Sequence, residues 1–530
     1  MGIDRQSVVL VRKRGTNRIS CSRFLAVFAI LNFVCGLGKS RGGEIGPDII
    51  AAEITAVSDY VSVGDFAGIT MTITSCNAGD EVADWYPLPS NRHPVIAQNM
   101  YRLMDGQLKQ IGQAWVKHGF AALQNPTCYL DCIPSHPNAL GVHCSDPYQS
   151  SLNRGPELGR RSEINPVTGF FDGPTANRHV GHIHTSLSHA LQVKHSDLAI
   201  PGARYFVEVQ YVGADDALAG NGNNNVSYRE QFMSGTPGNW NFANTGGTMR
   251  RTPAIYAWPG AAWSVVDSWP EDGRIIVSYK VTDFGGGQWR YDYAVYNMNS
   301  DRGIGSFSVP VGVTKVGSMD FYGVLSHEED LEVTNDPWET EVRQGNATWS
   351  TLAYPSVRAN PIRWGTMYNF WLFSDSPPVP SYVTLGRFKP GTLPLLRALV
   401  MAPSAGDCNR NGRSDDLDIA VGFSRDLDED GLPDECEVCG HSMACGEQDL
   451  CAVHSCVDGW CAHTPLTYGD TNQDGLVRLN DIECAVNGFG RYSLCPKADV
   501  YGCDTDGGVD MRDVLAIIEA FEGSDACCEP

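Results

Sequence analysis

The sequence predicts a mainly β protein, in which a β-sandwich-type body of one or two sandwiches precedes a small module of calcium loops and short helices. Three observations support this fold class. Apolar and polar residues alternate with period two in many stretches before residue 390, as they do in half-buried strands. Gly, Pro and Asn turns separate these stretches, and helical periodicity is nearly absent among them. Residues 407–530 differ from the preceding residues in composition, because they are acidic and rich in cysteine, and their oxygen-bearing side chains recur at regular spacing.

The first 40 residues have the order of a secretory signal peptide. Basic residues between positions 12 and 23 precede an apolar run at 24–34, and small residues follow it. The apolar run is too short to span a bilayer. Cys35 leaves a lipoprotein anchor open as an alternative. We therefore expect a secreted or cell-surface protein without a membrane span.

Residues 41–220 are predicted to form a first β-rich domain. The stretches 54–61 and 69–74 alternate with period two, and 205–212 is another apolar strand pattern. Asp105 and Gly106 stand between two apolar runs, which is a strong signal for a two-residue hairpin turn.

Residues 221–390 are predicted to form a second β-rich sandwich domain. The polar run 221–225 marks the expected boundary, and 391–406 is expected to be a linker. Further strands are expected at 275–281, 288–296, 306–311, 367–373 and 382–388. Within 288–296 the period-two pattern places four apolar side chains on one face, namely Trp289, Tyr291, Tyr293 and Val295.

Sixteen of the 18 cysteines lie beyond the signal peptide, and an even number in an exported chain indicates disulfides. Four of them, Cys76, Cys128, Cys132 and Cys144, lie in the body and allow three pairings. A zinc cluster is the alternative for the group Cys128, Cys132, His136, His143 and Cys144. Six further cysteines, from Cys436 to Cys461, lie in a predicted Cys-rich insert at 438–465 or just before it.

The negative charge of the chain is concentrated at its C-terminal end. Residues 407–530 contain 27 acidic and seven basic residues, a net charge of −20, against −23 for the whole sequence. Phosphate backbones require a basic face, so nucleic acid is excluded as a partner.

Four segments of this acidic region have the spacing of a calcium loop, with oxygen ligands at odd positions, a carboxylate at position 12 and Gly at position 6. Arg413, Leu432 and Leu476 contribute the main-chain carbonyl of position 7. In the last loop position 1 falls on Gly502, and Asp499 is the alternative. The predicted ligands are Asp407, Asn409, Asn411, Arg413, Asp415 and Asp418; Asp426, Asp428, Asp430, Leu432, Asp434 and Glu437; Asp470, Asn472, Asp474, Leu476 and Asp481; and Asp504, Asp506, Asp510 and Asp513.

Residues 466–530 resemble a dockerin type I module, because two loop-plus-helix segments follow one another and the second helix is rich in Leu and Ile. The paired loops at 407–437 are similar to thrombospondin type 3 repeats. The resemblance is to exported bacterial proteins, and it covers only the C-terminal end. It implies up to four structural Ca²⁺ ions and docking to a cohesin-like or surface protein.

Three groups of body residues are candidates for other chemistry. His179, His182, His184, His189 and His195 crowd one span and suit zinc or copper, although exposed loop histidines are the simpler interpretation. Glu163, Glu208, Asp292 and Glu328 are carboxylates that glycoside hydrolysis would need in pairs. Tryptophans are either sandwich core or stacking platforms for sugars: Trp240, Trp258, Trp263, Trp269, Trp289, Trp364 and Trp371.

The sequence therefore predicts a secreted or cell-surface calcium-binding protein with a β-sandwich binding or structural body and a calcium-stabilised docking module. The alternatives are a polysaccharide-acting hydrolase of O-glycosyl bonds, with polysaccharide as the partner of the body, and an adhesive or envelope-structural protein. No catalytic residue is identified.

Overall fold

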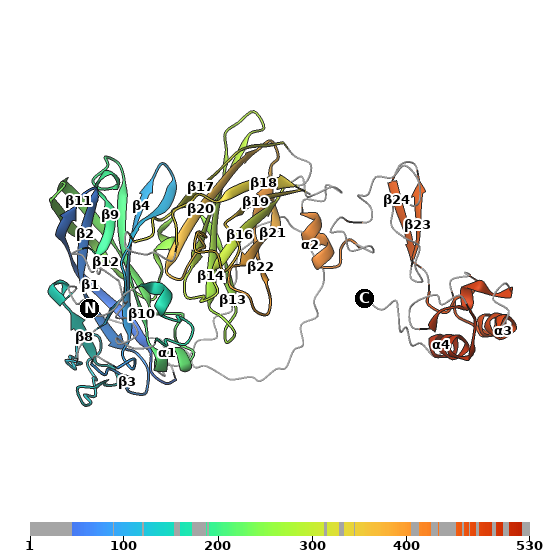
Figure 1. The fold of residues 1–530 in the computed structure, drawn as a ribbon, viewed down its shortest axis with the longest axis horizontal. Helices are drawn as coiled ribbons and strands as arrows, with labels where there is room; N and C mark the ends of the chain where they lie inside the picture. The colour runs from blue at the N-terminus through green and yellow to red at the C-terminus, as the bar shows by residue number, and fades with distance from the viewer. Residues whose placement is uncertain are drawn as a thin grey trace, which may run out of the picture. The chain divides into compact units, whose positions relative to one another are not determined.

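The computed structural model describes most of residues 45–530, which belong to one compact unit, and the predicted signal peptide lies outside this range. Figure 1 shows the order of the elements along the chain. Within 45–530 the gaps in the description are 88–89, 119–120, 153–159, 172–186, 188–189, 312–314, 328–332, 344, 404–412, 426–432, 434–451, 458–459, 466, 473–475, 490–493, 502–507 and 522–530.

The first body is built on one antiparallel sheet, whose main path runs β1-β2-β9-β5-β4-β10-β11-β12. β6 pairs with β4, β8 pairs with β2, and β3 pairs with β7 as a separate ribbon. The strands are β1 (Ile49–Val63), β2 (Phe66–Asn77), β3 (Ala83–Asp84), β4 (Val95–Met104), β5 (Gln107–Gln113), β6 (Lys117–His118), β7 (Ala139–Leu140), β8 (Ser145–Tyr148), β9 (Leu191–Lys194), β10 (Arg204–Val212), β11 (Val226–Thr236) and β12 (Asn239–Met249).

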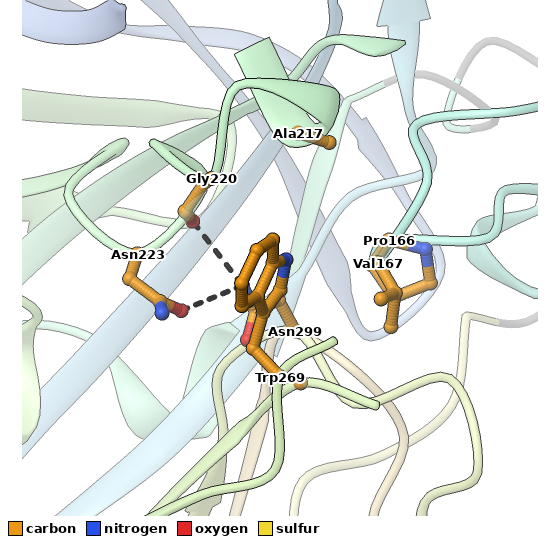
Figure 2. Close-up of a pocket in the computed structure, with 9 residues that line it drawn as sticks. Pro166, Val167, Ala217, Gly220, Asn223, Trp269 and Asn299 are labelled. Carbon is orange, nitrogen blue, oxygen red and sulfur yellow. Dashed lines mark hydrogen bonds between the residues drawn. The ribbon is translucent and has the colours of Figure 1, made fainter. Parts of the chain in front are cut away.

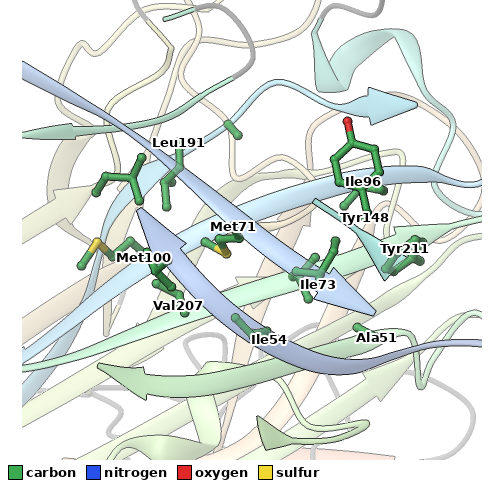
Figure 3. Packing of buried hydrophobic residues seen from close by; sticks show 14 of the residues in the cluster. Ala51, Ile54, Met71, Ile73, Ile96, Met100, Tyr148, Leu191, Val207 and Tyr211 are labelled. Atoms are coloured by element: carbon green, nitrogen blue, oxygen red, sulfur yellow. The ribbon is translucent and has the colours of Figure 1, made fainter. Parts of the chain in front are cut away.

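This sheet curls until its two edge strands, β1 and β12, lie against each other. Side chains join these edges: the Asn244 amide donates to the Thr55 carbonyl at 2.7 Å, and the Ile54 N–H donates to Thr248 Oγ1 at 3.0 Å. The curl encloses a core to which Ile54, Met71 and Val207 contribute from three different strands (Figure 3). The first body is thus one sheet folded on itself rather than two separate sheets.

The predicted hairpin at Asp105–Gly106 is confirmed. β4 and β5 pair antiparallel on either side of it, and both turn residues have positive φ, 52° for Asp105 and 77° for Gly106. Two successive positive φ values are characteristic of the type I′ turn, whose twist matches that of the flanking strands.

The second body is a sandwich of two five-stranded antiparallel sheets, with strand orders β13-β14-β15-β20-β17 and β18-β19-β16-β21-β22. The predicted apolar face is confirmed, because Tyr291, Tyr293 and Val295 are buried in the core between the sheets and Trp289 packs against it. The strands are β13 (Ala262–Asp267), β14 (Arg274–Asp283), β15 (Trp289–Asn297), β16 (Ile304–Pro310), β17 (Val316–Gly323), β18 (Glu339–Arg343), β19 (Asn346–Ser350), β20 (Thr366–Ser374), β21 (Pro378–Arg387) and β22 (Leu395–Pro403).

The bodies divide at places other than those expected from composition. The polar run 221–225 lies within the first body, since β11 beyond it pairs with β10. The expected linker 391–406 contains β22, in which Leu396, Ala398 and Val400 face the core. The boundaries predicted from composition were wrong in both cases. A polar turn between paired strands has the composition of a linker, and the strand at the second boundary is short and follows a stretch that contains Pro and Gly.

The two bodies share a continuous buried interface. Its apolar part joins Leu108 and Phe206 of the first body to Ile276, Tyr296 and Met367 of the second. A 3₁₀ turn, η4 (Ala254–Ala257), connects the bodies within this cluster. Because the shared core is contiguous, we expect the two bodies to unfold together.

A polar network crosses the same interface and centres on Arg161 in the 3₁₀ turn η2 (Arg161–Glu163). The Arg161 guanidinium donates to the carbonyls of Ala114, Gln98 and Gly365 at 2.8–2.9 Å and to Asn99 Oδ1 at 2.7 Å. Gly365 belongs to the second body, so one buried cation joins the two bodies.

Glu208 is the carboxyl group of this network and is fully buried. Its carboxylate accepts from Asn99 Nδ2 and the Tyr101 hydroxyl at 2.8 Å, from the Tyr296 hydroxyl at 3.2 Å and from the Ala254 N–H at 2.6 Å. Burial raises the pKa of Glu208, while these donors lower it. Burial also lowers the pKa of Arg161 to about 10. Asn99 touches both charged groups and so connects them.

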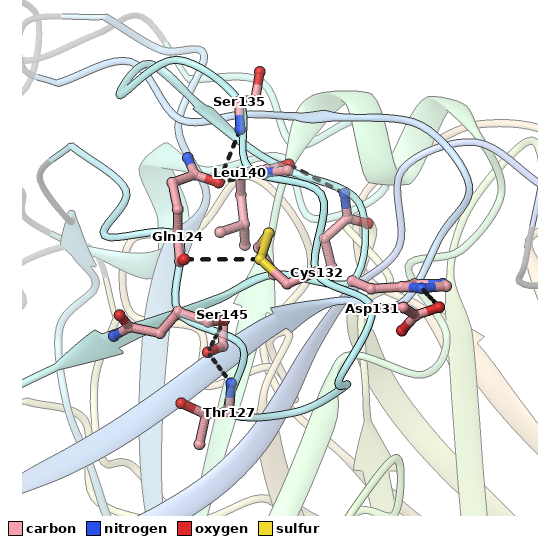
Figure 4. Close-up of a disulfide and its surroundings, with 12 residues drawn as sticks. Gln124, Thr127, Asp131, Cys132, Ser135, Leu140 and Ser145 are labelled. Carbon is pink, nitrogen blue, oxygen red and sulfur yellow. Dashed lines mark hydrogen bonds and ion pairs between the residues drawn. A yellow bond between two sulfur atoms is a disulfide. The ribbon is translucent and has the colours of Figure 1, made fainter.

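The body cysteines form two disulfides, Cys76–Cys128 and Cys132–Cys144, which selects one of the three possible pairings. Around the second, Gln124 Oε1 accepts from the N–H groups of Ser135 and Gly141 (Figure 4). A third disulfide, Cys484–Cys495, lies in the C-terminal module. These bonds fit an extracellular protein. No helix in the described part of the chain is long and apolar enough to cross a bilayer.

Where the structure describes it, the C-terminal region contains short helices and a β-hairpin. Two of the helices, α3 and α4, share a small core in which Ala485, Val514 and Ile517 are buried. The α-helices in the described part of the chain are α1 (Ala214–Leu218) in the first body, α2 (Asp415–Ala420), α3 (Leu479–Gly488) and α4 (Met511–Phe521), and the hairpin strands are β23 (Ala452–Val457) and β24 (Trp460–Pro465).

Candidate functional site

In three of the four predicted calcium loops, the structure describes the carboxylate at position 12. Asp418, Asp481 and Asp513 lie in the first turn of α2, α3 and α4, respectively. Their exposed fractions are 0%, 0% and 3%. A buried carboxylate requires hydrogen bonds or a cation, so we expect the residues around each of these side chains to supply donors or to bind a cation.

Asp481 closes the loop that precedes α3. Its Oδ1 accepts from the backbone N–H groups of Thr471 and Asn472 at 2.9 and 3.2 Å, and its Oδ2 accepts from the Arg478 N–H at 2.9 Å. The two ends of the loop are therefore held together by one side chain. Oδ2 takes one of these bonds and retains a lone pair for a further partner.

Asp513 closes the next loop in the same way. Its Oδ1 accepts from the N–H groups of Val500 and Tyr501 at 2.9 Å, and its Oδ2 accepts from the Asp510 N–H at 2.8 Å. Val500 and Tyr501 thus correspond to Thr471 and Asn472 of the preceding loop. The two loop–helix segments are structural repeats of each other.

This correspondence identifies the start of the last loop. Asp470 precedes Thr471, so its counterpart is the residue before Val500, which is Asp499. Asp499 is 1% exposed. Counted from Asp499, the last loop has fifteen residues (499–513) against twelve in the preceding one (470–481). The geometry thus favours Asp499 over Gly502 as position 1.

The two repeats also contact each other at their starts. The Tyr468 hydroxyl donates to the Val500 carbonyl at 2.9 Å. A Cβ added to Gly469 would lie 2.8 Å from the Cβ of Ala520 in α4, and Gly469 has a φ of 83°. Only glycine meets both conditions without displacing α4. We infer that the two loops fold as a pair.

Many predicted ligands lie outside the described residues. Those that the structure describes are Arg413, Asp415, Asp418, Asp470, Asn472, Leu476, Asp481, Asp510 and Asp513. Among the described residues, no three His, Cys, Asp or Glu side chains converge as a metal site. The loop centres 473–475 and 502–507, which contain Asp474, Asp504 and Asp506, lie outside the described residues.

Of the histidine cluster, only His195 is described. It accepts a hydrogen bond on Nδ1 from the Trp240 indole at 3.0 Å, so this nitrogen serves the packing of the first body. His179, His182, His184 and His189 lie outside the described residues. In the proposed zinc group, the cysteines are paired as disulfides, and His143 contacts Asp131 at 2.9 Å.

The candidate carboxylates that the structure describes have different surroundings. Glu208 is enclosed in the interface network, whereas Asp292 pairs with Arg290 and accepts from Gln107. Glu163 lies in η2, and Glu328 lies outside the described residues. Sequence reasoning missed Arg161, because a single arginine in a loop-rich stretch has no periodic signature.

The tryptophans divide between core and surface. Trp240, Trp258 and Trp364 are buried, whereas Trp263 and Trp269 are each 54% exposed. Trp269 borders a shallow pocket of about 10 Å³ at the junction of the bodies (Figure 2). Asn299 also lines it and donates to the Gly222 carbonyl and to Asn223 Oδ1. Its volume suits one water molecule.

No family model matches the chain, and no curated protein matches it in sequence. The class of the protein is therefore described by its fold and its disulfide bonds. It is a mainly β, disulfide-bonded protein with a C-terminal pair of loop–helix repeats.

Proposed function

We propose that this is a secreted or cell-surface protein whose C-terminal module folds around Ca²⁺ and docks to a partner, while its β body has a binding or structural role. The observation that carries the proposal is the matched hydrogen-bond pattern of Asp481 and Asp513, which closes two tandem loops around buried carboxylates. Six to eight oxygen ligands around a hard cation require such closed loops.

The residues of the two repeats fit such an ion. Asp470, Asn472, Asp474, the Leu476 carbonyl and Asp481 would hold it in one loop. In the other, Asp499, Asp504, Asp506, Asp510 and Asp513 would do so. A bound cation would neutralise carboxylates that otherwise repel one another, so metal binding would contribute directly to folding.

Exposed apolar side chains on the helices support docking. Val486 of α3 is 55% exposed and Leu515 of α4 is 52% exposed, although both helices bury other apolar residues in the small core. Exposed apolar side chains on so small a module favour contact with a partner protein. The resemblance to dockerins points to a cohesin-like partner.

Polysaccharide is the second candidate partner, and it would bind to the body. The half-exposed indoles of Trp263 and Trp269 favour it, because planar aromatic faces stack on sugar rings. Hydrolysis of polysaccharide stays an alternative prediction, which reducing-sugar release from a panel of polysaccharides would test.

The test of the calcium assignment is the Asp499→Ala variant, titrated with Ca²⁺ by calorimetry. We expect the affinity of the last loop to fall about ten-fold or more, equivalent to about 1.4 kcal/mol, because a position-1 ligand is lost. Glu519→Ala removes an exposed carboxylate from α4 and serves as the control. If both variants bind as the unaltered chain does, Asp499 is not a ligand.

A further inference from the structure

A larger pocket, of about 140 Å³, lies where the first body meets the second. Ile164, which follows η2, forms one wall from the first body. Pro361 and Trp364, which precede β20, and Phe388, which follows β21, form the facing walls from the second. Pockets at such junctions are frequent sites for small ligands.

The walls of this pocket are apolar and partly aromatic. Trp364 is 3% exposed, and its indole N–H already donates to the Arg161 carbonyl at 2.7 Å, so the ring has no remaining donor for a ligand. Ile164, Val333 and Pro361 also lack side-chain polar groups. Polar groups of a sugar ring that lay against these apolar side chains would lose their hydrogen bonds to water, so this part of the lining favours an aromatic ring.

The volume limits the ligand to one ring. An apolar protein cavity of about 150 Å³ holds a benzene molecule, and this pocket is of similar size. Trp364 and Phe388 offer aromatic faces or edges to such a ring.

The charged groups that line the pocket are mostly cationic. Lys389 is paired with Asp301 at 2.9 Å, so these two charges offset each other, and Arg302 adds a positive charge to the lining. Arg302 donates from Nε to the Lys389 carbonyl at 3.0 Å and from Nη1 to the Thr392 carbonyl. Carbonyl oxygens orient the guanidinium but do not neutralise it. An anionic group at the pocket would therefore be stabilised.

From these observations we infer that the pocket binds a small monocyclic aromatic carboxylate, with the ring between Trp364 and the aliphatic walls and the carboxylate near Arg302. The inference concerns the body alone and does not depend on calcium binding by the C-terminal module. Benzoate is the simplest molecule with this chemistry.

The test is calorimetry and ligand-observed NMR of the full mature chain with benzoate. We expect saturable one-site binding with a Kd of about 0.1–1 mM, as suits a ligand of this size. Benzamide, which has the same shape without the charge, should bind at least ten-fold more weakly. Equal binding of benzamide, or binding of glucuronate in preference to benzoate, would overturn the assignment.

Two variants locate the site. Arg302→Gln should weaken benzoate binding about ten-fold, whereas Arg397→Gln, which removes an exposed arginine from β22, should have no effect. Val333→Phe should abolish binding by filling the pocket, and it leaves every charge in place. If benzoate does not bind, or binds equally to Val333→Phe when that variant melts like the unaltered chain, the inference is wrong.

Discussion

Removal of calcium is expected to lower the melting temperature of the fragment 407–530 by about 10–20 °C, while the body fragment 41–406 changes little. A ligand at about 100 times its Kd stabilises a folded module by about 2.7 kcal/mol per site, and 1 kcal/mol shifts a small module by about 4–8 °C. The measurement is differential scanning calorimetry of both fragments with Ca²⁺ and with EDTA.

The physical reason is the net charge of −20 of the C-terminal region, since the region has only a small apolar core to oppose the repulsion between its carboxylates. Asp481 and Asp513 are buried, and their loops carry further carboxylates in the sequence, so a bound cation would offset the negative charge of each loop. Mg²⁺ added after EDTA is the control for ionic strength. Equal shifts of the two fragments would contradict the calcium assignment.

Replacement of Arg161 by Met is expected to destabilise the body by about 3–5 kcal/mol, the effect of removing one partner from a buried ionic network. The substitution leaves the Ala114 carbonyl and Asn99 Oδ1 without the donor that Arg161 supplies. The Gly365 carbonyl loses one donor and keeps those of Asn99 Nδ2 and Gln110 Nε2. It also leaves Glu208 buried without its cation. Urea unfolding of the body, followed by tryptophan fluorescence, measures the change.

The control for this variant is Arg204→Met. Arg204 pairs with Glu230 on the surface and is 50% exposed, so its loss should cost about 1 kcal/mol or less. If Arg161→Met destabilises the body no more than Arg204→Met does, the network does not hold the two bodies together. Separation of the unfolding curve into two transitions would indicate that Arg161 couples the bodies.

Local patterns predicted much of the fold. The alternation at 288–296 placed Tyr291, Tyr293 and Val295 on one face because a strand has only two faces, and these side chains are indeed buried together. The Asp105–Gly106 turn was predictable because few residue pairs accept positive φ twice. These features depend on residues close together in sequence.

Features that depend on distant residues could not be predicted in this way. The closure of the first sheet brings β1 against β12, although nearly the whole domain separates them in sequence. The role of Arg161 in joining the two bodies depends on its hydrogen bond to Gly365, about 200 residues away in sequence. The disulfide pairing and the pocket between the bodies likewise arise only when separate segments meet.

The candidate site shows the same division. The spacing of oxygen side chains identified the loops, and it placed Asp481 and Asp513 at position 12, where they are now seen in the first turns of helices. The spacing alone did not decide between Gly502 and Asp499, because an insertion shifts the count. The hydrogen bonds of Asp513 to Val500 and Tyr501 favour Asp499.

The most direct test of the central claim is native mass spectrometry of the mature chain after exchange into calcium-containing buffer. The account predicts up to four bound Ca²⁺ ions, with fewer ions on a double variant that carries Asp481→Ala and Asp513→Ala. A chain that binds no Ca²⁺ beyond the level of a matched Mg²⁺ sample, or a double variant with an unchanged ion count, would contradict it.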